Sequence, residues 1–481
     1  MSLRVAIRDR LLSRPAVLVA HAVGLVVLSR LLTPTDFGLF ALAAVGYWIA
    51  VALADLGLKS LLLKETHLDP RRHGEAVGLA LVSAVVVSGA FAAIAFVLPD
   101  SVAPPAMDLA LWVLAASILM GPLDLLFNIP LMQSMRFGLI SVVNVIGAWT
   151  RCGVSILAAL YDAGPAALAA GLLAEQIVSF GLFAAARRQE RIPAPRLTGW
   201  STLIADGGRL SATQVVRYLG DLSMMSAISA FLGVATLGIY NRANQVVKLF
   251  DSVFLASLSP VVLPAFAQAV DKGHAPAAIY LKKVELLSAL IWPAFATIAL
   301  MADPLCRVVL GPGWPTAPVI VQLLALMGIT KPLTNMSQSL FVALGELRLG
   351  ARLDVQHHII RGALASLGAL ISLEAVCLGL FIAQVINGAR QTRAFGRSTD
   401  YAYGDMRSLL MKSALLTVFT VGPAALALYA LQSTHALLEL AVGGAAAMAG
   451  FVIAATLMQH TLFFEARKAF RAIPWERLRR G

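Results

Sequence analysis

The chain has 481 residues, of which 59% are hydrophobic and only 13% are charged, with a formal net charge of +12. The charged share is about half of that in soluble domains. Hydrophobic runs of about 20 residues recur from end to end, the length that a helix needs to cross a bilayer. These runs are too long for strands and do not alternate. The composition therefore predicts an all-α polytopic membrane protein.

The predicted spans are separated mostly by short links, which leave no room for a soluble domain. A polar, basic segment precedes the first hydrophobic run, so we expect this run to be the first span and not a cleaved signal peptide. About fourteen spans are predicted, near residues 15–32, 38–62, 76–98, 107–130, 139–160, 164–186, 207–231, 237–264, 284–302, 316–343, 352–372, 375–390, 412–431 and 437–462.

The first two spans are joined by the segment Thr33-Pro34-Thr35-Asp36. Thr33 is a suitable N-cap, Pro34 suits the first helical position, and Asp36 completes a capping box for the second span. Arg30 lies about one turn before this segment. It either extends to the lipid headgroups or faces the outer mouth of a cavity.

Basic residues are distributed very unevenly over the links between spans. With a cytoplasmic N-terminus, every Lys and Arg outside the spans falls on the cytoplasmic side except Arg307. This asymmetry follows the positive-inside rule and predicts that both termini are cytoplasmic. It also accounts for the net charge, so nucleic acid is not expected as a partner. The basic ends are expected to contact anionic membrane lipids.

An internal repeat relates the two halves of the chain. The segment "LSRLLTPTDFGLFALA" at 28–43 aligns with "ISAFLGVATLGIYNRA" at 228–243, which pairs Gly38 with Gly238. Six spans separate the copies, so they have the same orientation and predict two six-helix lobes with a site between them, plus two extra C-terminal helices. The predicted layout is a basic cytoplasmic arm (1–14), an N-lobe (15–186), a cytoplasmic linker (187–206), a C-lobe (207–390), a second cytoplasmic linker (391–411), spans 13 and 14 (412–462) and a basic cytoplasmic tail (463–481).

Ionisable residues inside spans are costly, and they usually face protein or a water-filled cavity. In the eighth span, one helical face carries four polar residues, and two more flank it: Asn241, Asn244, Lys248 and Asp251, with Arg242 and Gln245. This face either lines a cavity or forms a polar seam in which Lys248 pairs with Asp251.

Two other spans of the second half carry basic residues. Arg217 and Asp221 are four residues apart, so they either form a neutral pair on one face or leave Arg217 exposed to a cavity. Lys331 precedes Pro332, a residue that breaks or kinks helices. Lys331 either lines a cavity or lies where the kinked helix is solvated.

Acidic residues dominate the polar positions of the first half, namely Asp55, Asp124 and Glu175. A network of Asp124, Arg151 and Glu175 is plausible and would be structural if it is fully paired. If one carboxylate retains a raised pKa, it could carry a proton. The ion-coupling candidates are therefore Asp221, Asp251, Asp124, Glu175 and Asp55.

Neither a metal site nor a cofactor is predicted. Cys152, Cys306 and Cys377 are scattered without a CxxC pair, and the adjacent His357 and His358 lie near a cytoplasmic helix end. The outward links are acidic and the interior carries cations, a pattern that suits an anionic substrate released outward.

Several motifs together resemble those of bacterial polysaccharide-export flippases. They are the segment at 28–43 and "ADLGLKSLLLK" (54–64), "ATLGIYNRANQVVKL" (235–249), "SPVVLPAFAQ" (259–268) and "VVLGPGWPTAPVIVQLLAL" (308–326). The chain is identified as a member of the polysaccharide-transport branch of the multidrug/oligosaccharidyl-lipid/polysaccharide exporter superfamily, with the resemblance covering roughly residues 15–390.

This resemblance implies a transporter of the bacterial inner membrane that flips a polyprenyl-diphosphate-linked oligosaccharide repeat unit to the outer leaflet by alternating access. It implies coupling to an H+ or Na+ gradient and a place beside glycan polymerase and export machinery. Basic cavity residues would bind the diphosphate, so the substrate-binding candidates are Arg242, Lys248, Arg217, Lys331, Arg30, Asn241, Asn244 and Gln245. The first two spans lack a mid-membrane arginine, which shifts the expected site toward the second lobe.

Two alternatives remain open at this stage. A drug or metabolite antiporter of the same superfamily would share the fold, although its cavity tends to be less cationic. A membrane-embedded polysaccharide polymerase or ligase would need acids or histidines on a large outer loop, whereas the outer links here are short. No HExxH, Walker A or Ser/His arrangement is present in the sequence, so no catalytic residue is predicted.

Overall fold

The computed structural model describes residues 3–65, 69–97, 105–188, 193–271, 276–335, 337, 341, 344–399, 403–431 and 435–458. Every regular element in these ranges is a helix, which confirms the all-α prediction. The predicted tail over 463–481 lies outside the described residues. Of the predicted arm over 1–14, residues 3–14 belong to the first helix, which begins at Leu3.

Twelve helical segments among the described residues are long and hydrophobic enough to cross a membrane. Of two further predicted spans, 237–264 lies within α11 (Val234–Asp271) and 352–372 overlaps α17 (Leu347–Gly368), and both helices carry several charged residues. The chain is therefore a multi-pass helical membrane protein, while the number fourteen stays a prediction.

The residues form two compact units by their internal packing. The first contains 1–245 with 358–376, and the second contains 246–357 with 377–481. The helices α11, α17 and α18 (Leu373–Thr399) each contribute residues to both units. The two predicted six-helix lobes stay a prediction.

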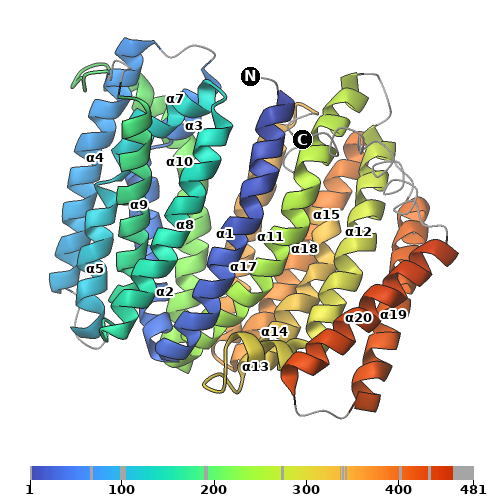
Figure 1. Ribbon diagram of the computed structural model, residues 1–481. Coiled ribbons are helices and arrows are strands. Elements are labelled where there is room, and N and C mark those ends of the chain that lie inside the picture. Colours follow the sequence, from blue (N-terminus) through green and yellow to red (C-terminus); the bar gives the residue numbers. More distant parts are fainter. Residues whose placement is uncertain are drawn as a thin grey trace, which may run out of the picture. The chain divides into compact units, whose positions relative to one another are not determined.

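The first unit is built from antiparallel helices whose hydrophobic faces meet in one core (Figure 1). Within it, α8 packs against α1 and α9, and α2 packs against α4, α5 and α10. Its helices, apart from those shared with the other unit, are α1 (Leu3–Leu31), α2 (Pro34–Asp55), α3 (Leu58–Lys64), α4 (Pro70–Val97), α5 (Pro105–Ile118), α6 (Gly121–Leu123), the π-helix η1 (Asp124–Asn128), α7 (Ile129–Gln133), α8 (Phe137–Leu160), α9 (Ala166–Ala186), α10 (Trp200–Ala227) and the π-helix η2 (Ile228–Leu232).

The start of α2 follows the sequence prediction in detail. The helix begins at Pro34, and the Thr33 side chain accepts a hydrogen bond from the Asp36 backbone N–H at 3.2 Å. The Asp36 carboxylate in turn accepts from the Thr33 backbone N–H at 2.9 Å. The capping box is therefore confirmed.

In the second unit, α12 packs against α14 and α19, while α20 packs against α19 and α13. An ion pair between Arg307 and Glu439 at 2.6 Å ties α13 to α20. The helices of this unit are α12 (Pro276–Leu300), α13 (Ala302–Val309), α14 (Ala317–Leu326), the 3-10 helix η3 (Met327–Thr330), α15 (Lys331–Thr334), α19 (Tyr403–Leu431) and α20 (Ala436–Leu457).

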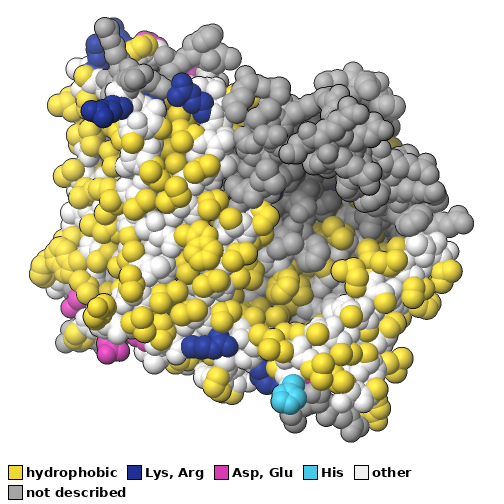
Figure 2. All heavy atoms as spheres, in the orientation of Figure 1, with side chains coloured by type: hydrophobic (Ala, Val, Ile, Leu, Met, Phe, Trp, Pro, Cys, Tyr) yellow, Lys and Arg dark blue, Asp and Glu magenta, His cyan; other side chains and the backbone are white. Residues whose placement is uncertain are grey.

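Hydrophobic side chains cover the flanks of the helices that face the viewer in Figure 2, as expected for surfaces in contact with lipid tails. On the left-hand part of that view, basic side chains lie at the upper end. Acidic side chains and a few further basic ones lie at the lower end. Charge is thus confined to the two ends of the helices on this face, where lipid headgroups and water would be.

Candidate functional site

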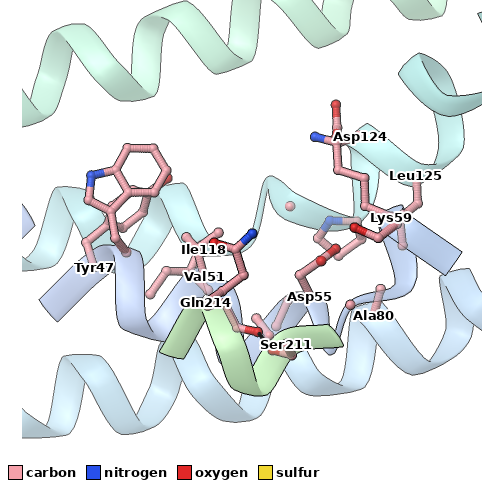
Figure 3. A pocket seen from close by; sticks show the side chains of 18 of the residues that line it. Tyr47, Val51, Asp55, Lys59, Ala80, Ile118, Asp124, Leu125, Ser211 and Gln214 are labelled. Carbon is pink, nitrogen blue, oxygen red and sulfur yellow. Dashed lines mark hydrogen bonds and ion pairs between the residues drawn. The ribbon is translucent and has the colours of Figure 1, made fainter. Parts of the chain in front are cut away.

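A cavity of about 490 Å³ lies inside the first unit, between α2, α3, α4, η1, α9 and α10 (Figure 3). Its wall is mixed: hydrophobic residues of α2, α4 and α5 alternate with polar side chains. The polar and aromatic lining residues are Tyr47, Trp48, Asp55, Lys59, Ser60, Asp124, Gln176, Phe180, Ser211, Gln214, Arg217 and Tyr218. Tyr47 lies near one end of the close-up, and Lys59 and Asp124 lie near the other.

The cavity forms where the second span is broken. The helix α2 ends at Asp55, and α3 begins at Leu58 after two residues with positive φ, Leu56 and Gly57. The backbone of α10 approaches this break so closely that a Cβ at Gly57 would lie 2.3 Å from the carbonyl oxygen of Gly207. Glycine is required at Gly57 both for its conformation, with φ of 72°, and for this approach.

The last carbonyl groups of a helix have no partners within the helix and need donors from elsewhere. Two serine hydroxyls supply these partners. Ser211 donates to the carbonyl oxygen of Ala52 at 2.7 Å, and Ser83 donates to that of Ala54 at 2.6 Å. These hydrogen bonds stabilise the break between α2 and α3, which places Asp55 and Lys59 at the cavity wall.

The fourth span is also irregular, since it passes through η1 where it borders the cavity. A π-helix leaves carbonyl groups without their usual partners, and such elements often mark functional sites. Here His73 lies 2.9 Å from the carbonyl oxygen of Leu125, and Arg187 donates to that of Leu126. Both side chains are buried, so they stabilise the irregular segment that presents Asp124.

The charged end of the cavity contains one cation and two acids. Lys59 forms an ion pair with Asp124, whose carboxylate also accepts from Asn128 at 2.8 Å. The Asp55 carboxylate lies against the backbone N–H groups of Gly57 and Lys59, where the N-terminus of α3 favours a negative charge. Each charge at this end therefore has a local partner.

Arg217 lies in the cavity wall, where its contacts among the described residues are with an amide and an aromatic ring. Its guanidinium donates to the Gln214 side chain and lies 5.2 Å from the centre of the Tyr218 ring. Asp221, the predicted alternative partner, instead pairs with Arg361 at 2.8 Å. Within the part of the chain that the structure describes, no carboxylate forms an ion pair with Arg217, so this cation is available to a ligand.

The predicted network of Asp124, Arg151 and Glu175 divides into two separate pairs. Arg151 pairs with Glu175 at 3.3 Å, while Asp124 belongs to the Lys59 pair described above. Neither Arg151 nor Glu175 is among the lining residues of the cavity. This arrangement agrees with the structural reading of Arg151 and Glu175.

Arg242 is deeply buried and is not a lining residue of the cavity. Its guanidinium lies 3.5 Å from the centre of the Phe37 ring, and its Nε has no hydrogen-bond partner among the described residues. On the same helix, Gln245 donates to Asn241 at 2.9 Å. Asn244 is half-buried. Asn241 and Gln245 therefore contact each other along α11, whereas Arg242 contacts Phe37 of α2.

The remaining candidates lie elsewhere. Lys248, Asp251 and Lys331 belong to the second unit, where Asp251 pairs with Lys331, whose Nζ lies 4.3 Å from the centre of the Phe295 ring. Lys331 therefore has both an acid and an aromatic face as partners. Arg30 is exposed and donates to the carbonyl oxygen of Val26 at 2.8 Å.

Several cavity residues are not among those predicted from the sequence, above all Lys59, Gln214, Gln176 and the aromatic residues Trp48 and Tyr218. The sequence could have indicated Lys59, because this residue closely follows Gly57, where a helix is expected to end. The aromatic and amide residues carry no such signal, since Trp and Gln also occur in ordinary helix contacts.

Comparisons with known proteins agree with this architecture. Residues 27–318 match the family model described as polysaccharide biosynthesis protein. The succinoglycan biosynthesis transport protein ExoT of Rhizobium meliloti (strain 1021) is 24% identical over 64% of this chain, and the match spans 62% of ExoT. The lipopolysaccharide biosynthesis protein WzxC of Escherichia coli (strain K12) is 22% identical over 76% of this chain and 75% of its own length.

Solved transporters share the fold. The lipid II flippase MurJ in an inward closed conformation superimposes with a TM-score of 0.69, at 14% identity, over 93% of this chain and 99% of MurJ. An inward-facing multidrug resistance transporter of the MATE family and MOP superfamily gives a TM-score of 0.55, at 14% identity, over 85% of this chain and 96% of its own. Because the family model matches more than half of the chain, this multi-pass protein belongs to the polysaccharide biosynthesis protein family, as its sequence motifs predicted.

Proposed function

We propose that this protein flips a polyprenyl-diphosphate-linked oligosaccharide repeat unit from the inner to the outer leaflet of the bacterial inner membrane, for exopolysaccharide or lipopolysaccharide synthesis. The observation that carries the proposal is the position of Arg217, a cation in the cavity wall that forms no ion pair with a carboxylate among the described residues. The names of the relatives, a succinoglycan transport protein and a lipopolysaccharide biosynthesis protein, support the substrate class.

Arg217 has the chemistry that a diphosphate requires. A guanidinium stays charged inside a membrane protein and presents paired N–H donors that match two phosphate oxygens. Gln214 and the Tyr218 ring hold it in one orientation, so less side-chain freedom is lost when an anion binds. The low dielectric of the cavity strengthens the attraction relative to water.

The two acids of the cavity lie with Lys59 and not with Arg217. Asp55 and Asp124 lie with Lys59 at the end formed by α3 and η1, whereas Arg217 lies on α10. A phosphate bound at Arg217 is therefore separated from the carboxylates that would repel it. Asp55 and Asp124 are then candidates for coupling the transport cycle to H+ or Na+, together with Asp221, Asp251 and Glu175, which this proposal carries over from the sequence.

The transport cycle in this proposal needs no covalent catalysis and no cofactor. The protein would expose the cavity alternately to the two sides of the membrane, with both termini in the cytoplasm and with glycan polymerase or export machinery downstream. A drug or metabolite antiporter would share the fold, but an unpaired arginine in the cavity favours an anionic substrate. The relative ExoT is named as a transport protein, which favours transport over a polymerase or ligase.

The test is complementation of a strain that lacks this gene and exports no polysaccharide. We expect Arg217→Gln to lower export at least about tenfold, because a neutral amide cannot replace a guanidinium at a phosphate. Arg217→Lys should retain part of the activity. Lipid-linked repeat units should accumulate on the cytoplasmic leaflet, which selective oxidation of the outer-leaflet glycan can measure.

Arg188→Gln is the matched control, since Arg188 is exposed, lies in the same unit and is not a cavity residue. It should export at the wild-type rate. Normal export by Arg217→Gln at a normal membrane level would overturn the proposal. Restored resistance to cationic drugs without restored polysaccharide would instead favour the antiporter.

A further inference from the structure

Three aromatic rings gather at the end of the cavity opposite the Lys59–Asp124 pair. Trp48 and Tyr218 stack with ring centroids 6.5 Å apart and an angle of 15° between their planes. Tyr47 meets Trp48 edge to face at 5.0 Å. Since α2 and α10 are antiparallel neighbours, this cluster joins two helices across the cavity wall.

Only part of this aromatic cluster belongs to the hydrophobic core of the first unit. Tyr47 is 1% exposed and belongs to the hydrophobic core of the first unit, whereas its neighbour Trp48 is 41% exposed and lines the cavity. Tyr218 is half-buried and also lines the cavity. The two stacked residues therefore offer a broad aromatic surface to whatever enters.

A buried acceptor without a donor lies beside this surface. Gln176 donates through Nε2 to the Tyr47 hydroxyl at 3.0 Å, which fixes the orientation of its amide. Its Oε1 is buried and accepts no hydrogen bond within the described residues. An unsatisfied buried acceptor costs stability unless a ligand donates to it. On the other side, Gln214 adds an exposed amide to the rim.

Aromatic faces next to amide groups are the chemistry that recognises sugars. The C–H bonds of one pyranose face pack on an indole or phenol ring, while the hydroxyls at the ring edge exchange hydrogen bonds with amides. A nucleobase or a drug could also stack here, but neither has a ring of hydroxyl donors to match the free Gln176 oxygen.

The position of Arg217 indicates which part of the ligand contacts the aromatic residues. Arg217 and Tyr218 are consecutive on α10, and the guanidinium lies over the Tyr218 ring at 5.2 Å. A phosphate at Arg217 therefore places the group bonded directly to it at the aromatic surface. We propose that Trp48, Tyr218 and Gln176 form a saccharide subsite that holds the sugar ring joined to the diphosphate. This inference rests on the proposed function and deepens it.

Photocrosslinking in producing cells tests the subsite. Trp48 and Tyr218 are replaced one at a time by p-benzoylphenylalanine, the glycan is labelled metabolically with a radioactive sugar, and the cells are irradiated. Mild acid then cleaves the sugar–phosphate bond. We expect the radioactive glycan to remain on the protein after acid at both positions, because the photoreactive ring touches sugar and not lipid.

Trp149 is the matched control position, since it is 43% exposed and is not a cavity residue. It should retain at most about a tenth of the glycan label found at position 48. Adducts at positions 48 and 218 that lose all glycan after acid would overturn the subsite, as would the absence of adducts at both positions while position 214 gives glycan adducts. Loss of glycan adducts at all three positions would count against the proposed function itself.

Substitutions supply a second readout. Trp48→Phe keeps a stacking face and should retain most of the export, while Trp48→Ala should lower it about tenfold. Gln176→Glu keeps the acceptor and should be tolerated better than Gln176→Leu. Equal export by Trp48→Ala and by the control Trp149→Ala would contradict the assignment.

Discussion

Gly38 of α2 and Gly238 of α11 each lie against the backbone of the other helix. A Cβ at Gly38 would be 2.0 Å from the carbonyl oxygen of Val234, and a Cβ at Gly238 would be 1.7 Å from that of Pro34. The repeat aligns Gly38 with Gly238 and Pro34 with Val234, so the two contacts are reciprocal. The starts of the two repeat helices therefore cross by a local two-fold relation that only glycine permits.

The first prediction concerns this crossing. Gly38→Ala and Gly238→Ala should each destabilise the protein by about 1–3 kcal/mol, because the new methyl group forces the two backbones apart. The thermal unfolding midpoint in detergent, followed by tryptophan fluorescence, measures the effect. Gly181→Ala on α9 is the control: its Cβ would meet no atom within 4 Å, so it should be neutral or stabilising. Equal midpoints for all three variants would contradict the crossing.

Local signals in the sequence predicted local structure well. The capping box of Thr33 and Asp36 depends on residues three apart, and the helical nature of the chain depends on the length of its hydrophobic runs. The repeat also aligned Gly38 with Gly238, although nothing in the sequence indicated that the two residues touch. Features set by one helix or by the repeat were therefore predictable.

Partners of the charged residues were not predictable, because they depend on packing between distant segments. Asp221 has an arginine four residues away but pairs with Arg361 of α17. Asp251 has Lys248 on its own face but pairs with Lys331. The sequence thus identified residues that carry charge, while the tertiary structure determines which of them pair among the described residues.

The second prediction concerns the break in the second span. Gly57→Ala should destabilise the protein, because φ is 72° there and the new Cβ would lie 2.3 Å from the carbonyl oxygen of Gly207. Positive φ alone costs about 1–2 kcal/mol for a residue with a side chain. Gly121→Ala is the control, since it also lines the cavity but has open space around it. Size-exclusion profiles and unfolding midpoints should separate the two variants. A well-folded Gly57→Ala protein would show that α10 approaches less closely than described.

The third prediction concerns Cys306 in α13, outside the hydrophobic spans. Burial, with the nearby Asp303 carboxylate, raises the pKa of this thiol to about 12. A raised pKa keeps the thiol protonated, so at pH 8 only about one molecule in 10,000 carries the reactive thiolate. In a variant with Cys152 and Cys377 replaced by Ala, a charged maleimide should leave native Cys306 unlabelled from pH 7 to 9 and label it after unfolding.

Asp303→Cys in a cysteine-free chain is the control for that experiment. The Asp303 side chain is 60% exposed and lies one turn before Cys306 on the same helix. It should be labelled within minutes at pH 8. Comparable labelling of Cys306 in the native protein would mean that its thiol is neither buried nor protonated as the geometry indicates.

The last prediction tests whether Arg361, by pairing with Asp221, prevents an ion pair between Asp221 and Arg217. Without Arg361, the Asp221 carboxylate loses its partner and lies four residues from Arg217 on α10, a spacing that permits an ion pair. Arg361→Gln should therefore lower export about tenfold, although Arg361 does not line the cavity. The double variant Asp221→Asn with Arg361→Gln removes both charges and should recover most of the export at a similar membrane level. If Arg361 were needed only for its own charge or for packing, the double variant would be as defective as the single one. Recovery would instead show that the Asp221–Arg361 pair acts by keeping a carboxylate away from the cavity arginine.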